Sequence, residues 1–189
     1  MSARTFRLFG AFARDNRGSI LIELAIGLPV LVVILLGCFE ASRYVLLNQK
    51  LARVASSTAD LVAQVDGITE AQISDLFAAA DDTAKPFALA TDGRVVVTSV
   101  YRPTTAAATV AWQRISPGTL SVTSTVGAPG GTATLPAGFT LRQGENVIIA
   151  EVFYAYRPVF VGATEFTSAT LHEIAYNRPR MINLTQVNP

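Results

Sequence analysis

The chain has little cysteine, histidine or charge. Its 189 residues include one cysteine, Cys38, and one histidine, His172. A single cysteine excludes an intramolecular disulfide framework, and one cysteine with one histidine offers few soft ligands for a zinc ion. We therefore expect no metal centre, and no cofactor is implied by any motif.

Charge is both sparse and balanced. Fifteen Lys and Arg residues stand against 14 Asp and Glu, which gives a formal net charge of +1. This balance carries no signature of nucleic-acid binding, so we expect no nucleic-acid partner. Charged residues make up 15% of the chain, against about a quarter in an average soluble domain. With a mean hydropathy of +0.39, part of the apolar content is expected in a membrane segment.

One long apolar run fits that expectation. The residues from Leu24 to Phe39 carry no charge, and the run reaches back to Ser19 if Glu23 is tolerated. A helix of about 20 residues covers roughly 30 Å, the thickness of the hydrocarbon core of a bilayer. The sequence predicts a transmembrane helix over residues 19–40, with a kink near Pro29, and lipid as its surroundings.

The charges around this run indicate its orientation. Before it stand Arg4, Arg7, Arg14 and Arg17, and after it stand Arg43, Lys50 and Arg53. The excess on the amino-terminal side favours a cytoplasmic amino terminus, and a long polar domain can be translocated largely irrespective of its charge. We therefore expect the bulk of the chain to be exported.

Glu23 is the most informative residue of the run, because a carboxylate inside an apolar helix is costly and normally marks a function or a partner. It is the fifth residue after Gly18. A basic leader ending in glycine, an acid at the fifth following position and an apolar run resemble the class III, type IV pilin-like prepilin signal. That resemblance implies a cytoplasmic leader over residues 1–18, cleaved between Gly18 and Ser19 by a prepilin peptidase. It also implies pairing of Glu23 with the freed amino group of Ser19 in a neighbouring subunit.

Two alternatives remain open for this region. In one, the anchor is never cleaved, and Glu23 extends towards the headgroups as long polar side chains do near helix ends. In the other, Leu35-Leu36-Gly37-Cys38 is a lipobox, and Cys38 carries lipid after removal of the apolar run. Either would make the protein a membrane-tethered periplasmic binding module that does not assemble.

The helical pattern continues beyond the membrane run into a predicted stalk over residues 41–66. Residues 41–65 contain no glycine or proline, and apolar or small residues recur in a heptad-like stripe, at Leu47, Leu51, Val54, Thr58, Leu61 and Val65. The spacing predicts one long helix over residues 20–65. We expect the distal half of the stripe to pack on the sheet of its own domain rather than on the helix of another protein.

Residues 67–189 are predicted to form an exported α+β domain. Thr69 and Gln72 form a capping box for a second helix, with Ile73, Leu76, Phe77 and Ala80 on its apolar face and an end near Asp81. Period-two, β-branched segments then predict strands at Arg94–Arg102, Thr109–Ile115, Asn146–Arg157 and about Thr164–Tyr176. The expected fold is a long amino-terminal helix packed on an antiparallel sheet of about four strands, as in pilins.

The region from Ser116 to Gly144 is rich in glycine and proline. It predicts a mobile connection with a short strand at Leu120–Val126, or alternatively a loop that contacts a subunit or ligand. The first interpretation is the simpler one.

Few residues suggest catalysis. His172 and Glu173 are adjacent, which is typical of a surface pair, and no nucleophile elbow accompanies them. Glu145 and Glu151 are expected on one solvated face of a strand. The cluster of Phe153, Tyr154 and Tyr156 is expected to lie half in the core and half at an interface. The sequence predicts no enzyme.

Several segments, taken in order, resemble the TadE-like minor pseudopilins of the tight-adherence (Flp) type IV pilus. They are Gly18 to Glu23, the apolar helix with Pro29, the stalk around Lys50–Arg53, Trp112 and Arg114, the run Gly144–Tyr156, and Arg178-Pro179-Arg180. Leu24 stands where the major pilins usually have tyrosine, and the chain is far longer than they are.

The resemblance implies a subunit that assembles into the pilus, primes it or forms its tip, in cell adhesion, at the bacterial inner membrane. Its implied partners are the prepilin peptidase, other pilin or pseudopilin subunits and the inner-membrane assembly platform. The residues suited to helix packing in lipid are Ala25, Gly27, Pro29 and Gly37.

Overall fold

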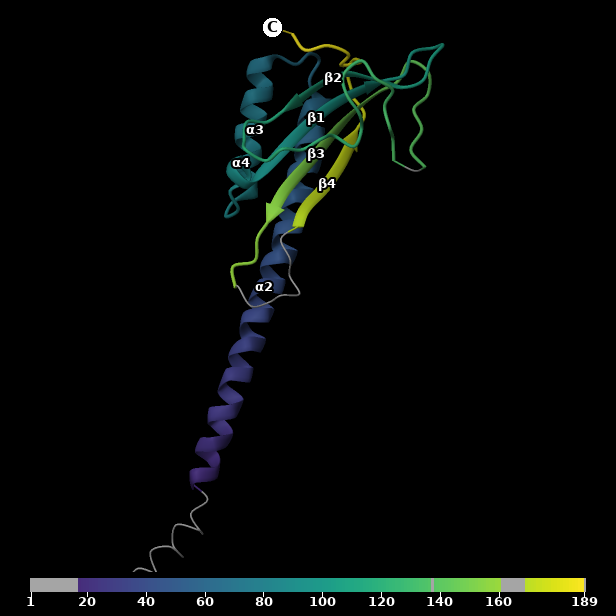
Figure 1. Ribbon diagram of the computed structural model, residues 1–189. Helices are drawn as coiled ribbons and strands as arrows, with labels where there is room; N and C mark the ends of the chain where they lie inside the picture. The colour runs from purple at the N-terminus through teal and green to yellow at the C-terminus, as the bar shows by residue number, and fades with distance from the viewer. Residues whose placement is uncertain (1–16, 137, 161–168, 189) are drawn as a thin grey trace, which may run out of the picture. The chain divides into compact units, whose positions relative to one another are not determined.

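A computed structural model describes residues 17–136, 138–160 and 169–188 (Figure 1). The elements are α2 (Arg17–Gln64), α3 (Glu70–Ala84), α4 (Leu89–Asp92), β1 (Gly93–Tyr101), β2 (Thr109–Ile115), β3 (Asn146–Tyr156) and β4 (Ala169–Asn177). This layout confirms the predicted α+β class. By their contacts the residues form two compact units, Met1–Ser42 and Arg43–Pro189. Nearly all of the predicted leader, residues 1–18, lies outside the described residues.

The strands form a four-stranded sheet in the order β2-β1-β3-β4, and all neighbours are antiparallel. β1 and β2 are joined by a short connection and pair as the predicted hairpin, with a register irregularity between Ser99 and Val100. In the centre, Val97 of β1 lies opposite Ala150 of β3. The expected start of the last strand, near Thr164, falls outside the described residues.

The distal half of α2 packs on one face of this sheet, behind it in Figure 1. Leu47, Leu51 and Val54 are fully buried in a core that includes Val152 of β3. The predicted intramolecular packing of the stripe is therefore confirmed for its first part.

Farther along α2 the buried line departs from the predicted stripe. Leu61 is 47% exposed, whereas the next residue, Val62, is fully buried. An α-helix turns every 3.6 residues, so a repeat of 3.5 drifts by about 20° per heptad relative to a straight helix. Over the two heptads from Leu47 to Leu61 the drift is about 40°, which carries Leu61 to the edge of the buried face and leaves Val62 within it.

The second helix begins as predicted. Thr69 is the N-cap of α3, and its side chain and that of Gln72 form the reciprocal capping box. The helix continues past the predicted end near Asp81 to Ala84, and the short helix α4 was not predicted.

Side-chain contacts join both ends of α3 to neighbouring elements. Lys50 of α2 donates to the carbonyl of Thr83 over 3.1 Å, and Arg114 of β2 pairs with Glu70. The hydrogen bond from Arg114 lowers the pKa of Glu70.

The glycine-rich region covers the opposite face of the sheet. Val126 and Leu141 are 1% and 2% exposed, and they form a second core with Val147 and Ile149 of β3. No strand forms at the described residues 120–126, where one was predicted. Apolar anchors seat the segment on the sheet, and its mobility stays a prediction. Glycines allow these turns, as at Gly130, where φ is +80°.

A buried carboxylate fastens this covering segment to the sheet. Glu151 of β3 is fully buried and its Oε1 accepts hydrogen bonds from the backbone N–H and the hydroxyl of Thr125, at 2.9 and 2.6 Å. The Ser124 hydroxyl donates to the other oxygen. His172 Nε2 lies 3.2 Å from Oε1. The expected solvated Glu151 is therefore wrong, and the partner of His172 is Glu151 across the strand pair rather than the adjacent Glu173.

The carboxyl-terminal segment crosses the sheet and returns to the helices. The carbonyl of Leu184 accepts hydrogen bonds from Trp112 Nε1 and Ser99 Oγ at 2.8 and 2.6 Å, and the N–H of Leu184 donates to Asn146 over 3.0 Å. Asn188 forms an isolated parallel bridge with Thr69, so the chain ends beside the start of α3 (Figure 1). We call residues 178–188 the strap.

The aromatic cluster of β3 lies in the core. Phe153, Tyr154 and Tyr156 are 7%, 5% and 2% exposed, which leaves no aromatic patch there for a partner. The expectation that half of this cluster is an interface is wrong, because both faces of β3 are covered.

Candidate assembly site on the amino-terminal helix

The first unit presents an apolar helix surface that nothing in the described chain covers. Leu21 and Val33 are 67% and 69% exposed, and the neighbouring apolar side chains of this segment are exposed as well. The helix is long and apolar enough to cross a membrane, by its length and composition. Lipid would remove this surface from water, as burial in a core does in a soluble protein.

Glu23 lies on one face of this helix, above a gap left by a glycine. Ser19, Glu23 and Gly27 are spaced at i, i+4 and i+8, so they follow each other along the same side of the helix. Apart from its two neighbours in the chain and the backbone of its own helix, no atom of the described residues lies within 4 Å of the place of a Cβ atom on Gly27. A shallow hollow of about 310 Å³ results, lined by Ile20, Glu23, Leu24, Gly27, Leu28 and Leu31.

The other residues predicted for helix packing do not all share that face. At about 100° per residue, Ala25 and Pro29 lie on the side of the helix away from Glu23, whereas Gly37 returns to the Glu23 side. α2 continues through Pro29 without a break in its helical assignment. Close helix packing at any of these positions stays a prediction.

The Glu23 carboxylate has no partner of opposite charge among the described residues. Glu23 has no ion pair or hydrogen bond within the described part of the chain. A carboxylate in an apolar medium is stable only when paired or protonated, so a cation from another molecule would stabilise its charged form. Gly18 and Ser19 stand in the first turn of α2, and cleavage between them is untested.

Cys38 is free and exposed on α2. The helix continues past it, and Ser42 Oγ donates to its carbonyl over 2.8 Å. The Leu35–Cys38 segment is therefore helical, and its interpretation as a lipobox is untested.

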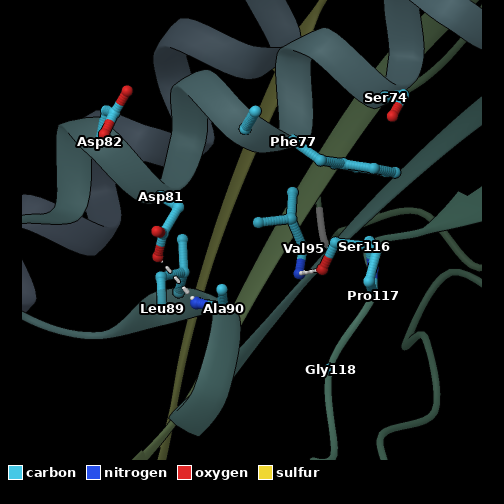
Figure 2. A pocket seen from close by; sticks show the side chains of 11 residues that line it. Ser74, Phe77, Asp81, Asp82, Leu89, Ala90, Val95, Ser116, Pro117 and Gly118 are labelled. Atoms are coloured by element: carbon cyan, nitrogen blue, oxygen red, sulfur yellow. Dashed lines mark hydrogen bonds between the residues drawn. The ribbon is translucent and has the colours of Figure 1, made fainter.

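The second unit contains a cavity of about 450 Å³ between α3, α4 and the start of the connection after β2. Figure 2 shows two of its polar groups engaged with backbone: the Asp81 carboxylate accepts from the N–H of Ala90 over 2.8 Å, and Ser116 Oγ accepts from that of Val95 over 2.9 Å. These bonds hold α4 and β1 in place, and the polar wall has a structural role. Asp82, which also lines the cavity, pairs with Lys85.

These observations define a class, an α+β protein whose apolar amino-terminal helix carries a carboxylate within its apolar run. The family model of TadE-like proteins matches residues 18–60. This match confirms the resemblance for the segment that holds Gly18, Glu23 and the first part of the stalk. Among curated proteins and among solved structures, no significant match to the chain was found.

Proposed function

We propose that the protein is a minor pseudopilin that takes part in assembly, priming or tip formation of a tight-adherence (Flp) pilus. In this proposal the leader is cut between Gly18 and Ser19, and the helix remains as the anchor. The observation that carries the proposal is Glu23, an acid without a partner among the described residues, on a helix face that Gly27 opens for a neighbour.

The family match supports this assignment from the sequence side, because it begins at Gly18 and covers the membrane run and the first part of the stalk, to residue 60. The freed amino group of Ser19 would supply the cation that Glu23 lacks, in trans from an adjacent subunit. Pairing offsets the cost of holding both charges in lipid. Gly27 would let the neighbouring helix approach closely at the same height.

The proposal also fixes the surroundings of the protein. The amino terminus is on the cytoplasmic side of the bacterial inner membrane, where the prepilin peptidase acts, and the domain after Ser42 is periplasmic. Its partners are other pilin or pseudopilin subunits and the inner-membrane assembly platform. This role is one of binding and assembly and involves no enzymatic activity of the chain.

The first experiment is the intact mass and amino-terminal sequence of the protein from cells with and without their prepilin peptidase. A start at Ser19 that depends on the peptidase is the expected result. A start at Cys38 with attached lipid, or an uncut Met1 in both strains, would replace the proposal with a tethered binding module.

The second experiment tests Glu23 itself. We expect Glu23→Ala to remain in the membrane but to be lost from the sheared pilus fraction, because the subunit can no longer pair with its neighbour. Ile22→Ala is the matched control, since it trims an adjacent exposed side chain of the same helix outside the hollow and should leave incorporation unchanged. Normal incorporation of Glu23→Ala would exclude the assembly role of Glu23.

A further inference from the structure

We propose that the cavity between α3, α4 and the connection after β2 binds an arginine side chain of another protein chain. The inference concerns the second unit, Arg43–Pro189, by itself. It goes beyond the proposed function, because it requires neither a cleaved leader nor a membrane span.

The cavity has the size and the apolar wall of a binding pocket. Its volume of about 450 Å³ falls within the range of about 300–1,000 Å³ that is typical of ligand pockets. Leu89 and Val95 are 3% and 1% exposed, and they line it together with the half-buried ring of Phe77. These groups can remove the methylene groups of a long side chain from water.

The charges of the lining select a cation. Asp81 and Asp82 are acidic, and none of the described residues that line the cavity is basic. Asp82 is paired with Lys85, over 2.6 Å, at the surface. A negatively charged occupant would be repelled here, whereas a positively charged one would be attracted by Asp81.

The carboxylate of Asp81 is held in place and keeps one oxygen available. Its Oδ1 accepts a hydrogen bond from the N–H of Ala90 over 2.8 Å (Figure 2), and its Oδ2 has no hydrogen bond or ion pair among the described residues. Arg94 lies nearby, beside Gly118, but its guanidinium donates to the carbonyls of Ser116 and Leu120. Asp81 is therefore a positioned acceptor that a cation from another chain can bind.

Phe77 favours arginine over lysine as the occupant. Phe77 and Asp81 are four residues apart in α3, so they lie on the same side of the helix. A guanidinium is planar, pairs with a carboxylate and stacks on an aromatic ring, and it is more weakly hydrated than an ammonium group. Arginine is also enriched among the residues that anchor protein interfaces.

The mouth of the cavity favours a protein chain over a free small cation. Ser74 and Ala78 of α3 stand on one side of it and Pro117 on the other, and all three are exposed. The main chain that carries an inserted arginine can lie across these residues. It would gain contacts there that a free guanidinium compound lacks.

The test is a nuclear magnetic resonance titration of the full chain in a non-ionic detergent. The probe is the capped peptide acetyl-Gly-Arg-Gly-amide, and its matched control contains citrulline, in which a neutral urea group replaces the guanidinium. We expect the arginine peptide to shift the amide signals of Ala90 and Gly118 saturably, with several-fold higher affinity than the citrulline peptide. n-Propylguanidinium, the same side chain without a main chain, should bind more weakly than the arginine peptide.

Substitutions in α3 locate the site. Asp81→Asn removes the charge but keeps an oxygen that can accept from the N–H of Ala90, so this variant should fold and bind the arginine peptide several-fold more weakly. Asp75→Asn is the matched control, because Asp75 is an exposed acid of the same helix that does not line this cavity. Ala78→Phe fills the cavity from an exposed position and leaves Asp81 intact. It should also weaken binding, and it tests the site if Asp81→Asn fails to fold.

Several outcomes would overturn the proposal. They are the absence of saturable shifts, equal affinities for the arginine and citrulline peptides, and equal losses of affinity in Asp81→Asn and Asp75→Asn. Unchanged binding by Ala78→Phe would place the peptide elsewhere on the protein. Binding of n-propylguanidinium as tight as that of the peptide would replace the protein partner by a free small cation. None of these results bears on Glu23 or on leader cleavage, so the proposed function is tested separately.

Discussion

At the scale of single residues, Glu151 has the strongest effect on how the domain is organised. Its carboxylate is fully buried and accepts hydrogen bonds from Thr125 and Ser124, and His172 Nε2 lies 3.2 Å from it. A buried carboxylate without such partners would be too costly to retain. The hydrogen bonds of Glu151 therefore hold the glycine-rich connection against the sheet.

We expect Glu151→Ala to lower the free energy of unfolding by about 1–3 kcal/mol, because the hydrogen bonds that Thr125 and Ser124 donate to a charged acceptor are lost. Urea denaturation of the detergent-solubilised protein measures the change. Glu173→Ala is the control, since Glu173 is half-buried in β4 and has no hydrogen bond among the described residues. Equal stability of the two variants would contradict the anchoring role of Glu151.

Tyr154 gives a second prediction at this scale. Burial raises the pKa of its phenol, and the charge of Asp92 raises it further. In the unfolded chain a tyrosine ionises near pH 10, so folding favours the neutral form. The stabilising contribution is complete below that pH and is lost as pH rises towards the higher pKa of the folded state. As pH is raised from 8, the free energy of unfolding of the wild type should fall more steeply than that of Tyr154→Phe. An equal dependence on pH in the two proteins would contradict this prediction.

At the scale of elements, α2 has two kinds of apolar position in its distal half. Leu51 is fully buried against the sheet, and Leu61 is 47% exposed. Leu51→Ala should cost about 2–5 kcal/mol, because it removes buried methyl groups and leaves a cavity. Leu61→Ala should change stability by about 0.5 kcal/mol or less. Thermal unfolding followed by circular dichroism compares the stability of the two variants. A similar loss of stability in both would mean that Leu61 is buried, as the heptad stripe predicted.

Sequence patterns predicted the elements that local chemistry specifies. The capping box of Thr69 and Gln72 located the start of α3, and β-branched runs located β1, β2 and β3 to within about a residue at each end. These signals are local, because a cap or a period-two run depends only on residues near it in the chain.

The contacts between distant segments were not predictable in the same way. The cover formed by residues 116–144 depends on Val126 and Leu141, which have no periodicity between them, and on Glu151, whose partners Thr125 and His172 are 26 and 21 positions away in the sequence. An alternating strand pattern assigns a glutamate to solvent, and only the tertiary contact reverses that assignment. On the amino-terminal helix, by contrast, Glu23 was identifiable because a charge inside an apolar run stands out locally.

At the scale of the whole molecule, the strap contacts the sheet, α2 through the N–H of Arg180 and the carbonyl of Ala63, and the N-cap of α3 through Asn188. Asn146 is its central contact, since its amide donates to Ser99 Oγ and the Val100 carbonyl over 2.8 Å each and accepts from Leu184. We expect Asn146→Leu to release residues 178–188 to protease cleavage and rapid hydrogen exchange. Asn183→Ala is the control, because Asn183 makes one exposed hydrogen bond to Gly144. An equally protected strap in Asn146→Leu would show that apolar contacts alone hold it.

Both faces of the sheet are covered, and this affects how the register between its strands is selected. β1 and β3 are apolar on both faces, so sliding one past the other by a single residue would exchange one set of buried apolar side chains for another at little cost in hydrophobic burial. Polar residues discriminate between the two alignments instead. In a shifted pairing, the Glu151 carboxylate would point to the face of the sheet that α2 covers, away from Thr125 and Ser124. Asn146 would no longer accept the hydrogen bond from Leu184 of the strap. These few buried polar groups select the native strand alignment against alternatives that hydrophobicity alone would accept.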